Sequence, residues 1–218
     1  MTIRSITSRT KPSRLAKRGN YDETQIYQIL DEGLFCHIAY TEEGQPMMIP
    51  TGYGRIGNKL YIHGSVGSHF MRCLADGRTV CLAVSLLDGL VLARSAFHHS
   101  VNYRSVILFA AGTVVTDEQE RWDALEAFTD HILPGRWAAV RQPTASEMQK
   151  TMVISFPIEE ASAKMRSGDP SDDEEDYDLT VWAGVLPLEV LPLPAITDPK
   201  MRFDTAIPDN VQHYSRKK

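Results

Sequence analysis

Short strand-like segments at regular spacing constrain the fold of this 218-residue chain more than any other feature of its sequence. Apolar and β-branched runs recur along the chain, and Gly, Pro or charged turn residues separate them. We expect strands at residues 35–40, 46–50, 60–63, 79–87, 90–94, 105–115, 152–156, 161–166 and 180–190. Few helices interrupt this series, so the pattern predicts a mainly β fold, a barrel with helical decoration. Strand–helix alternation of the doubly wound kind is absent, as is a GxxxxGK[ST] motif.

Capping residues place four helices between these strands. Asp22 and Gln25 predict a capping box that opens a helix, and Gly33 ends it. The other predicted helices span residues 68–77 and 117–133, and a short one begins at 144. The segment 79–87 is almost wholly apolar, which predicts either burial on both faces or a strand that lines the inside of the barrel. Asp88-Gly89 predicts a hairpin turn after it.

Charge and composition divide the chain into three parts. Residues 1–18 form a basic arm, residues 19–192 a single barrel domain, and residues 193–218 a Pro-rich extended arm. The acidic run at 169–178 predicts a solvated loop. A basic arm can bind nucleic acid, but the net charge of −5 argues against that partner.

The cysteines and the apolar runs indicate a cytoplasmic protein without a membrane segment. Cys36, Cys73 and Cys81 show no CxxC spacing, and an odd count without a secretory signal fits a reducing compartment. The longest apolar stretch, 82–93, contains Asp88 and is shorter than the roughly 18 residues that a membrane span needs.

The stretch from residue 49 to 74 carries the strongest signal for a ligand. Gly64-Ser65-Val66-Gly67-Ser68 links a strand to a helix, where unpaired N–H groups and the helix dipole favour phosphate. Ser68 is a natural N-cap, and His69 and Arg72 would add donors within one turn. The same residues also fit a plain strand-to-helix turn. Pro50-Thr51 favours the ligand, because Pro at the end of a central strand suggests backbone that faces something other than a strand.

The sequence contains no motif typical of a metal site or of a serine hydrolase. No two of the histidines at 63, 69, 98 and 99 have the i, i+4 spacing of a zincin helix, and we expect no metal. A GxSxG elbow is also absent.

Several blocks together resemble the pyridoxamine 5′-phosphate oxidase-like family, in the flavin-nucleotide-binding branch related to 5-nitroimidazole-resistance proteins. These blocks are IPTGYGRIGNKLYIHGSVGSHFMRCL, LLDGLVLARSAFHHSVNYRSV, PGRW, EASAKMRSG and DDEEDYDLTVWAGVLPL. The resemblance covers residues 18–192 and implies a split β-barrel that binds FMN, usually as a homodimer with flavin sites at the subunit interface.

The resemblance also implies which residues hold the cofactor. Pro50 and Thr51 would lie along the flavin ring, and Asn102, Tyr103 and Arg104 would close the pocket or contact the phosphate. Trp137, with Arg136 or Trp182, would reach the partner subunit's flavin. The residues implied for the ribityl-phosphate are His63, Gly64, Ser65, Ser68, His69 and Arg72.

The implied activity is an FMN-dependent oxidoreductase that takes electrons from a nicotinamide donor and reduces nitroaromatic or quinone-like small molecules. His69 is the candidate proton donor, and its favoured alternative role is to cap the helix or bind phosphate. The oxidase's consecutive basic residues are replaced by Ser68-His69-Phe70, so vitamin B6 oxidation is not expected. FAD, haem or a deazaflavin are alternative cofactors, and a non-catalytic carrier or sensor is the alternative function.

Overall fold

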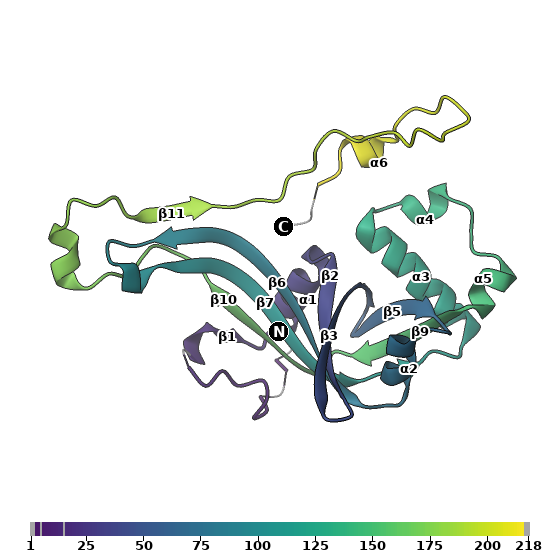
Figure 1. The fold of residues 1–218 in the computed structure, drawn as a ribbon, viewed down its shortest axis with the longest axis horizontal. Helices are drawn as coiled ribbons and strands as arrows, with labels where there is room; N and C mark the ends of the chain where they lie inside the picture. The colour runs from purple at the N-terminus through teal and green to yellow at the C-terminus, as the bar shows by residue number, and fades with distance from the viewer. Residues whose placement is uncertain (1–2, 5, 15, 216–218) are drawn as a thin grey trace. The chain divides into compact units, whose positions relative to one another are not determined.

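The computed structural model describes residues 3–4, 6–14 and 16–215, and within them the chain forms two compact units (Figure 1). Unit 1 combines Met1–Gly33, Ala83–Leu108 and Glu159–Val190. Unit 2 combines Leu34–Leu82, Phe109–Ile158 and Leu191–Lys218. Strands β6 (Thr79–Leu92) and β7 (Ser100–Ala111) each contribute residues to both units. The predicted domain boundaries at residues 18 and 192 stay predictions.

Unit 1 contains antiparallel strands in the order β1-β10-β7-β6, and β11 pairs with β6. Besides its parts of β6 and β7, its elements are η1 (Ala16–Arg18), β1 (Gly19–Asn20), α1 (Glu23–Glu32), η2 (Ala96–His98), β10 (Glu160–Arg166), η3 (Glu174–Asp178) and β11 (Gly184–Pro187).

Unit 2 contains strands in the order β6-β2-β3 and a four-stranded sheet in the order β4-β5-β9-β8. Its strands are β2 (Phe35–Glu42), β3 (Gln45–Gly52), β4 (Gly54–Ile56), β5 (Lys59–Ser65), β8 (Thr113–Val114) and β9 (Thr151–Pro157). Its helices are α2 (His69–Ala75), α3 (Glu118–Ile132), α4 (Arg136–Ala139), α5 (Ala145–Gln149) and α6 (Asp209–Gln212).

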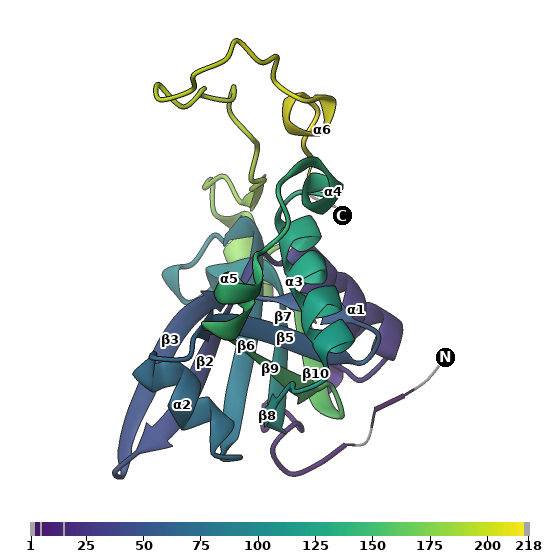
Figure 2. The same cartoon turned by 90° about the vertical axis from the view of Figure 1, so that its right-hand side faces the viewer.

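A hydrophobic cluster in unit 2 joins the four-stranded sheet to the helices that cover it. Helix α3 packs against β4 and β5, and α5 packs against β9 (Figure 2). Trp122 and Trp137 lie at the border of this cluster with their rings 6.0 Å apart, edge to face. The buried members are Tyr61, Val115, Ala124, Leu125, Met148 and Val153. These helices therefore hold the side chains that cover one end of β5 and β9.

The helix ends follow the predicted caps. The side chain of Asp22 accepts hydrogen bonds from the N–H groups of Thr24 and Gln25, and Gly33 ends α1. The reciprocal half of that predicted capping box is wrong, because the Gln25 amide donates to Gln28 and the Asp22 N–H donates to Asn20. A complete capping box opens α5.

The predicted hairpin turn at Asp88-Gly89 is wrong. Strand β6 continues through both residues to Leu92, because Gly89 pairs with Pro187 of β11. A Cβ on Gly89 would lie 3.0 Å from the Leu186 carbonyl oxygen, so close pairing with β11 favours a glycine here. Burial along β6 alternates, so only one face of this strand is buried. Of the two expectations for 79–87, burial on both faces is wrong, and the pattern fits a strand that lines the inside of a barrel.

Two further strand predictions are too long. The strand expected at 105–115 is divided at Gly112, where a Cβ would lie 2.8 Å from the Leu74 carbonyl oxygen and 2.9 Å from Ile154. The strand expected at 180–190 is limited to β11, and Trp182 lies outside it, exposed. Both errors arise because tertiary pairing, which local sequence does not encode, decides where a strand ends.

The charged terminal and acidic segments are partly packed. Arg4 contacts Tyr27 and Glu23, and Arg9 pairs with Glu160. In the acidic run, the Asp172 side chain is fully covered and accepts hydrogen bonds from the N–H and guanidinium of Arg94. The prediction of a solvated loop is therefore wrong at Asp172. The Asp172 carboxylate therefore holds the first part of the acidic run next to Arg94.

Candidate functional site

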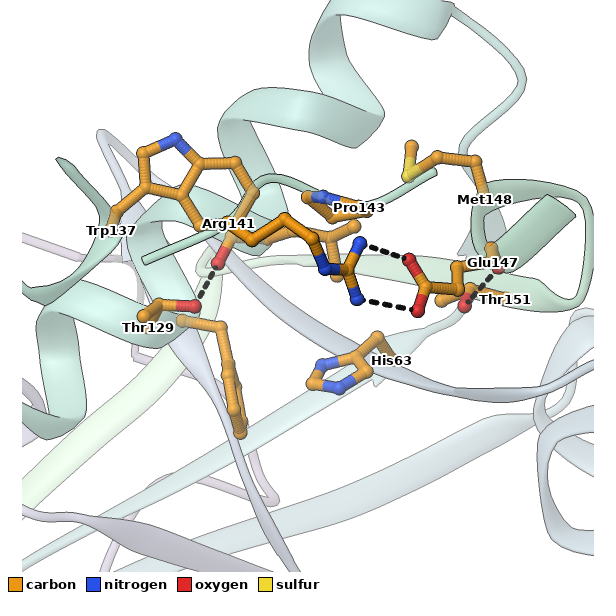
Figure 3. Close-up of a pocket in the computed structure, with 10 residues that line it drawn as sticks. His63, Thr129, Trp137, Arg141, Pro143, Glu147, Met148 and Thr151 are labelled. Carbon is orange, nitrogen blue, oxygen red and sulfur yellow. Dashed lines mark hydrogen bonds and ion pairs between the residues drawn. The ribbon is translucent and has the colours of Figure 1, made fainter. Parts of the chain in front are cut away.

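A pocket in unit 2 has a volume of about 320 Å³ and brings two predicted site residues, His63 and Trp137, into one lining (Figure 3). Strand β5 contributes His63, and the remaining lining residues follow along α3 to β9. They are Leu125, Phe128, Thr129, Trp137, Arg141, Pro143, Glu147, Met148 and Thr151. A volume of roughly 300–1,000 Å³ is typical of small-molecule and cofactor sites.

His63 is the one imidazole in the lining of this pocket. Its ring meets Phe128 edge to face with centroids 4.3 Å apart, and no hydrogen bond to the imidazole is found among the described residues. Burial lowers the pKa of His63 below its usual value, because the charged form loses solvation. The ring is therefore neutral at physiological pH, with a nitrogen lone pair available to a ligand.

An ion pair between Arg141 and Glu147 lies on the pocket lining (Figure 3). Two nearly parallel N–H···O contacts of 2.9 and 2.8 Å join the guanidinium to the carboxylate. Arg141, followed by the capping hydrogen bonds from Thr144, lowers the pKa of Glu147 to about 2. The carboxylate therefore stays charged over the physiological pH range.

Pro50 and Thr51 lie in β3, opposite His37 and Cys36 of β2. Strand β3 ends its sheet in the strand order, and an edge strand tolerates a proline because one side makes no ladder. Next to them, a Cβ on Gly52 would lie 2.7 Å from the Phe128 ring, which also contacts His63. The predicted ring-binding strand and the His63 pocket therefore share one aromatic side chain.

The loop after β5 places three of the predicted phosphate-binding side chains close together. Ser65 Oγ accepts from the Gly67 N–H at 3.1 Å, and Ser68 Oγ accepts from the Met71 N–H at 3.4 Å. Arg72 donates to the Gly67 carbonyl at 2.6 Å and pairs with no carboxylate among the described residues. Both hydroxyl hydrogens and the remaining Arg72 donors are left for a ligand. Gly64 has a packing role instead, because a Cβ added at this position would lie 2.8 Å from the Met71 side chain.

His69 is placed differently from the rest of this loop. Its Nε2 lies 2.6 Å from Glu42 Oε1 and 3.5 Å from Cys73 Sγ. Its predicted role as proton donor stays a prediction, and the Glu42 hydrogen bond competes with it.

The predicted residues Asn102, Tyr103 and Arg104 lie on β7, within unit 1. Asn102 is buried, donates to the Gly168 carbonyl and accepts from Arg166. The Arg104 guanidinium donates to both Asp88 and Glu32. Its donors are thus held by two carboxylates, which compete with the predicted phosphate contact.

Sequence reasoning missed most of the pocket lining. Phe128, Thr129, Glu147 and Met148 belong to no ligand-binding motif in the sequence. Helical periodicity could not have found Phe128, because an apolar residue on one face of α3 is equally typical of a core position.

The comparisons with known proteins show the family. The family model for pyridoxamine 5′-phosphate oxidase matches residues 22–165. This chain therefore belongs to the pyridoxamine 5′-phosphate oxidase family, and the predicted mainly β split barrel is confirmed.

Two solved structures are similar over nearly the whole chain. The flavocytochrome Anf3 from Azotobacter vinelandii is 38% identical, with 94% of this chain and 96% of that chain covered and a TM-score of 0.88. A FAD- and haem-binding protein from Mycobacterium smegmatis is 36% identical, with 89% and 96% covered and a TM-score of 0.85.

A third structure shares the fold. It is a proposed 5-nitroimidazole antibiotic resistance protein from Bacteroides thetaiotaomicron, 20% identical, with 67% of this chain and 85% of that chain covered and a TM-score of 0.58. No curated protein sequence matched this chain. Among the described residues, no helix is both long and apolar enough to cross a membrane.

Proposed function

We propose that this protein binds a flavin nucleotide, FAD in preference to FMN, and transfers electrons through it as an oxidoreductase. The observation that carries the proposal is the 38% identity to a flavocytochrome over 94% of this chain. The second relative, at 36% identity, is described as binding FAD and haem, which favours FAD over the FMN that the family resemblance implies.

The loop after β5 and the end of β3 fit the two ends of a flavin nucleotide. Ser65, Ser68 and Arg72 supply hydroxyl and guanidinium donors, which suit a phosphate. Pro50 and Thr51 lie on an edge strand, whose free side presents backbone groups to a planar ring. A bound flavin supplies hydride or one-electron chemistry. The chain's own contribution is to hold the phosphate and orient the ring.

The two relatives also favour haem as a second cofactor. His63 would be the residue that binds the haem iron, since its imidazole is neutral and free of hydrogen bonds to described residues. Phe128 and Trp137 line the same pocket and would flank a planar macrocycle. We therefore assign the phosphate-binding loop to the flavin and the His63 pocket to haem.

The first experiment is an absorbance spectrum of the untagged, purified protein, followed by mass analysis of what heat denaturation releases. Flavin bands with the FAD mass and a haem Soret band support both assignments. FMN in place of FAD would correct the nucleotide alone. No chromophore, and no flavin uptake on titration, would overturn the proposal.

Two substitutions separate the two sites. Arg72→Gln should weaken flavin binding by about tenfold or more, because it removes a charge-assisted hydrogen bond. His63→Gln should abolish the Soret band and leave flavin content unchanged. Arg9→Gln and His98→Gln are matched controls, because both residues lie outside the β5 loop and outside the His63 pocket.

Turnover distinguishes an enzyme from a carrier. A reductase should consume a nicotinamide donor in the presence of a nitroaromatic or quinone acceptor. A protein that holds reduced flavin without consuming the donor would support the carrier or sensor alternative.

A further inference from the structure

Three metal-ligating side chains of unit 2 meet at the start of α2. Glu42 lies at the end of β2, and His69 and Cys73 lie one helical turn apart on α2. One ligand atom from each lies within 4.8 Å of the other two. Cys73 Sγ is 3.2 Å from Glu42 Oε1 and 3.5 Å from His69 Nε2, which is itself 2.6 Å from the same Glu42 oxygen.

These separations are close to what a tetrahedral metal ion requires. Zinc binds Cys sulfur at about 2.3 Å and His nitrogen or carboxylate oxygen at about 2.0–2.2 Å. Tetrahedral geometry then places the ligand atoms roughly 3.3–3.7 Å apart. The two sulfur distances, 3.2 and 3.5 Å, are close to this range, and only the 2.6 Å hydrogen bond must lengthen by under about 1 Å.

Helix α2 presents its two ligands in a geometry that suits one ion. Residues i and i+4 lie on one face of a helix, so His69 and Cys73 both project toward Glu42. Cys73 is buried at 6% exposure, whereas the His69 side chain is 66% exposed. The sulfur is thus fixed on the protein side, and the opposite side is open to solvent.

We propose that Glu42, His69 and Cys73 form a binding site for a divalent zinc-like cation, with water as the fourth ligand. A thiolate, an imidazole and a carboxylate are the ligand types that zinc accepts, and three protein ligands plus water is the pattern of an open zinc site. This site departs from the expectation of no metal, which rested on residue spacings within single segments of the sequence.

Metal binding at this site releases one proton. The Cys73 thiol donates its hydrogen to Glu42 Oε1 in the metal-free structure. On binding, the S–H bond breaks, a sulfur–metal bond forms and the thiol proton leaves to solvent. The Nε2 proton of the neutral His69 ring, which bridges to Glu42, moves through solvent to Nδ1, so Nε2 and the Glu42 oxygen can both bind the ion. The nearby cation Arg78 is paired with Asp76 at 2.5 Å and donates to the Thr41 carbonyl. This pairing reduces its repulsion of an incoming cation.

The proposal is independent of the flavin and haem assignments. None of the three ligands lines the His63 pocket, and none is needed to hold the flavin phosphate at Ser65, Ser68 and Arg72. A bound metal would occupy His69 Nε2, so a metal site and the predicted proton donor are alternatives for this histidine.

The test uses the full-length, untagged, reduced protein and Co²⁺ as a spectroscopic probe. We expect one Co²⁺ per chain, a thiolate-to-cobalt charge-transfer band in the near ultraviolet, and loss of that band when one equivalent of Zn²⁺ is added. Cys73→Ser should abolish the band. Glu42→Gln and His69→Gln should each weaken Zn²⁺ binding by about tenfold or more.

Cys81→Ser is the matched control, because Cys81 lies outside the cluster and should leave both the band and the affinity unchanged. If the wild type gives no thiolate band, or the band survives in Cys73→Ser, the proposal is wrong. Should Cys73→Ser fail to fold, His69→Gln decides. Its side chain is largely exposed, so the variant should fold, and unchanged Zn²⁺ affinity would overturn the site.

Discussion

At the scale of single residues, Glu147 links the pocket lining to the stability of unit 2. Its pKa is lowered from 4.5 to about 2 by Arg141 and the Thr144 cap, so the folded state favours the charged carboxylate. A carboxylate with a depressed pKa adds stability above its unfolded pKa and loses that contribution as the pH falls through its folded pKa.

We therefore expect the free energy of unfolding to decrease as the pH falls from about 4.5 to 2, and Glu147→Gln to flatten this dependence. Denaturant unfolding at a series of pH values measures it. Arg141→Gln should flatten the dependence in the same way. Equal slopes in wild type and Glu147→Gln would show that the ion pair does not act on stability.

Arg104 pairs with two carboxylates at once, and among the described residues of unit 1 no other side chain has as many ion-pair hydrogen bonds. Its side chain is 28% exposed and contacts Glu32 of α1 and Asp88 of β6. Both carboxylates raise the pKa of Arg104 further above its usual value. Arg104→Met would remove the guanidinium that Asp88 and Glu32 share, and the partly buried Asp88 carboxylate would lose its cation, which costs more than the loss of the hydrogen bonds alone.

We expect Arg104→Met to lower the free energy of unfolding by about 2–3 kcal/mol. Arg141→Met is the matched control, because the Arg141–Glu147 pair is largely exposed to solvent and its loss should cost less stability. Chemical denaturation of both variants tests the difference. Similar losses in the two variants would mean that the Arg104 network is no stronger than a surface ion pair.

At the scale of elements, the sequence predicted the helices better than the strand ends. Asp22, Asp117 and Thr144 cap their helices through hydrogen bonds to residues two or three positions away, so the signal is local. The end of β6 depends on pairing with β11, nearly 100 residues further along the chain. A local turn signal such as Asp88-Gly89 yields to that pairing.

The same distinction applies to the sites. His63 and the Ser65–Arg72 loop were predictable because they fall within one continuous block. The Glu42–His69–Cys73 cluster joins two elements that are 27 residues apart at their closest, and no spacing rule connects them. Arg104 was predicted as a phosphate ligand because the carboxylates that hold it are distant in sequence.

Gly112 gives a test of the division between β7 and β8. A methyl group there would lie 2.8 Å from the Leu74 carbonyl oxygen and 2.9 Å from Ile154. We expect Gly112→Ala to destabilise the protein by about 1–3 kcal/mol through overpacking, measured by denaturant unfolding. Gly67→Ala, with its nearest contact at 3.5 Å, should be close to neutral. Equal stability of Gly112→Ala and wild type would show that the junction can move apart without cost.

At the scale of the whole molecule, the C-terminal arm exposes large apolar side chains. Leu193, Ile196 and Phe203 are 85%, 95% and 81% exposed. Exposed apolar side chains that gather on one segment mark an interaction surface. We propose that this arm contacts a second copy of the chain, in keeping with the homodimer that the family resemblance implies.

The purified protein should therefore be a dimer by light scattering coupled to size exclusion. Serine at residues 193, 196 and 203 together should weaken the dimer by about tenfold or more, since burial of one such side chain contributes about 1.5–3 kcal/mol. Asp204→Asn on the same arm should have no effect. A monomeric wild type would contradict the prediction.

Neither compact unit is encoded by a continuous stretch of the gene. Each unit is assembled from three segments that alternate along the chain. Strands β6 and β7 each contribute residues to both units. A cut anywhere between residues 43 and 150 would separate strands that both units need, so neither fragment would hold a complete unit. Changes in cofactor or substrate preference in such a chain must arise by substitution within the whole protein, not by exchange of a domain.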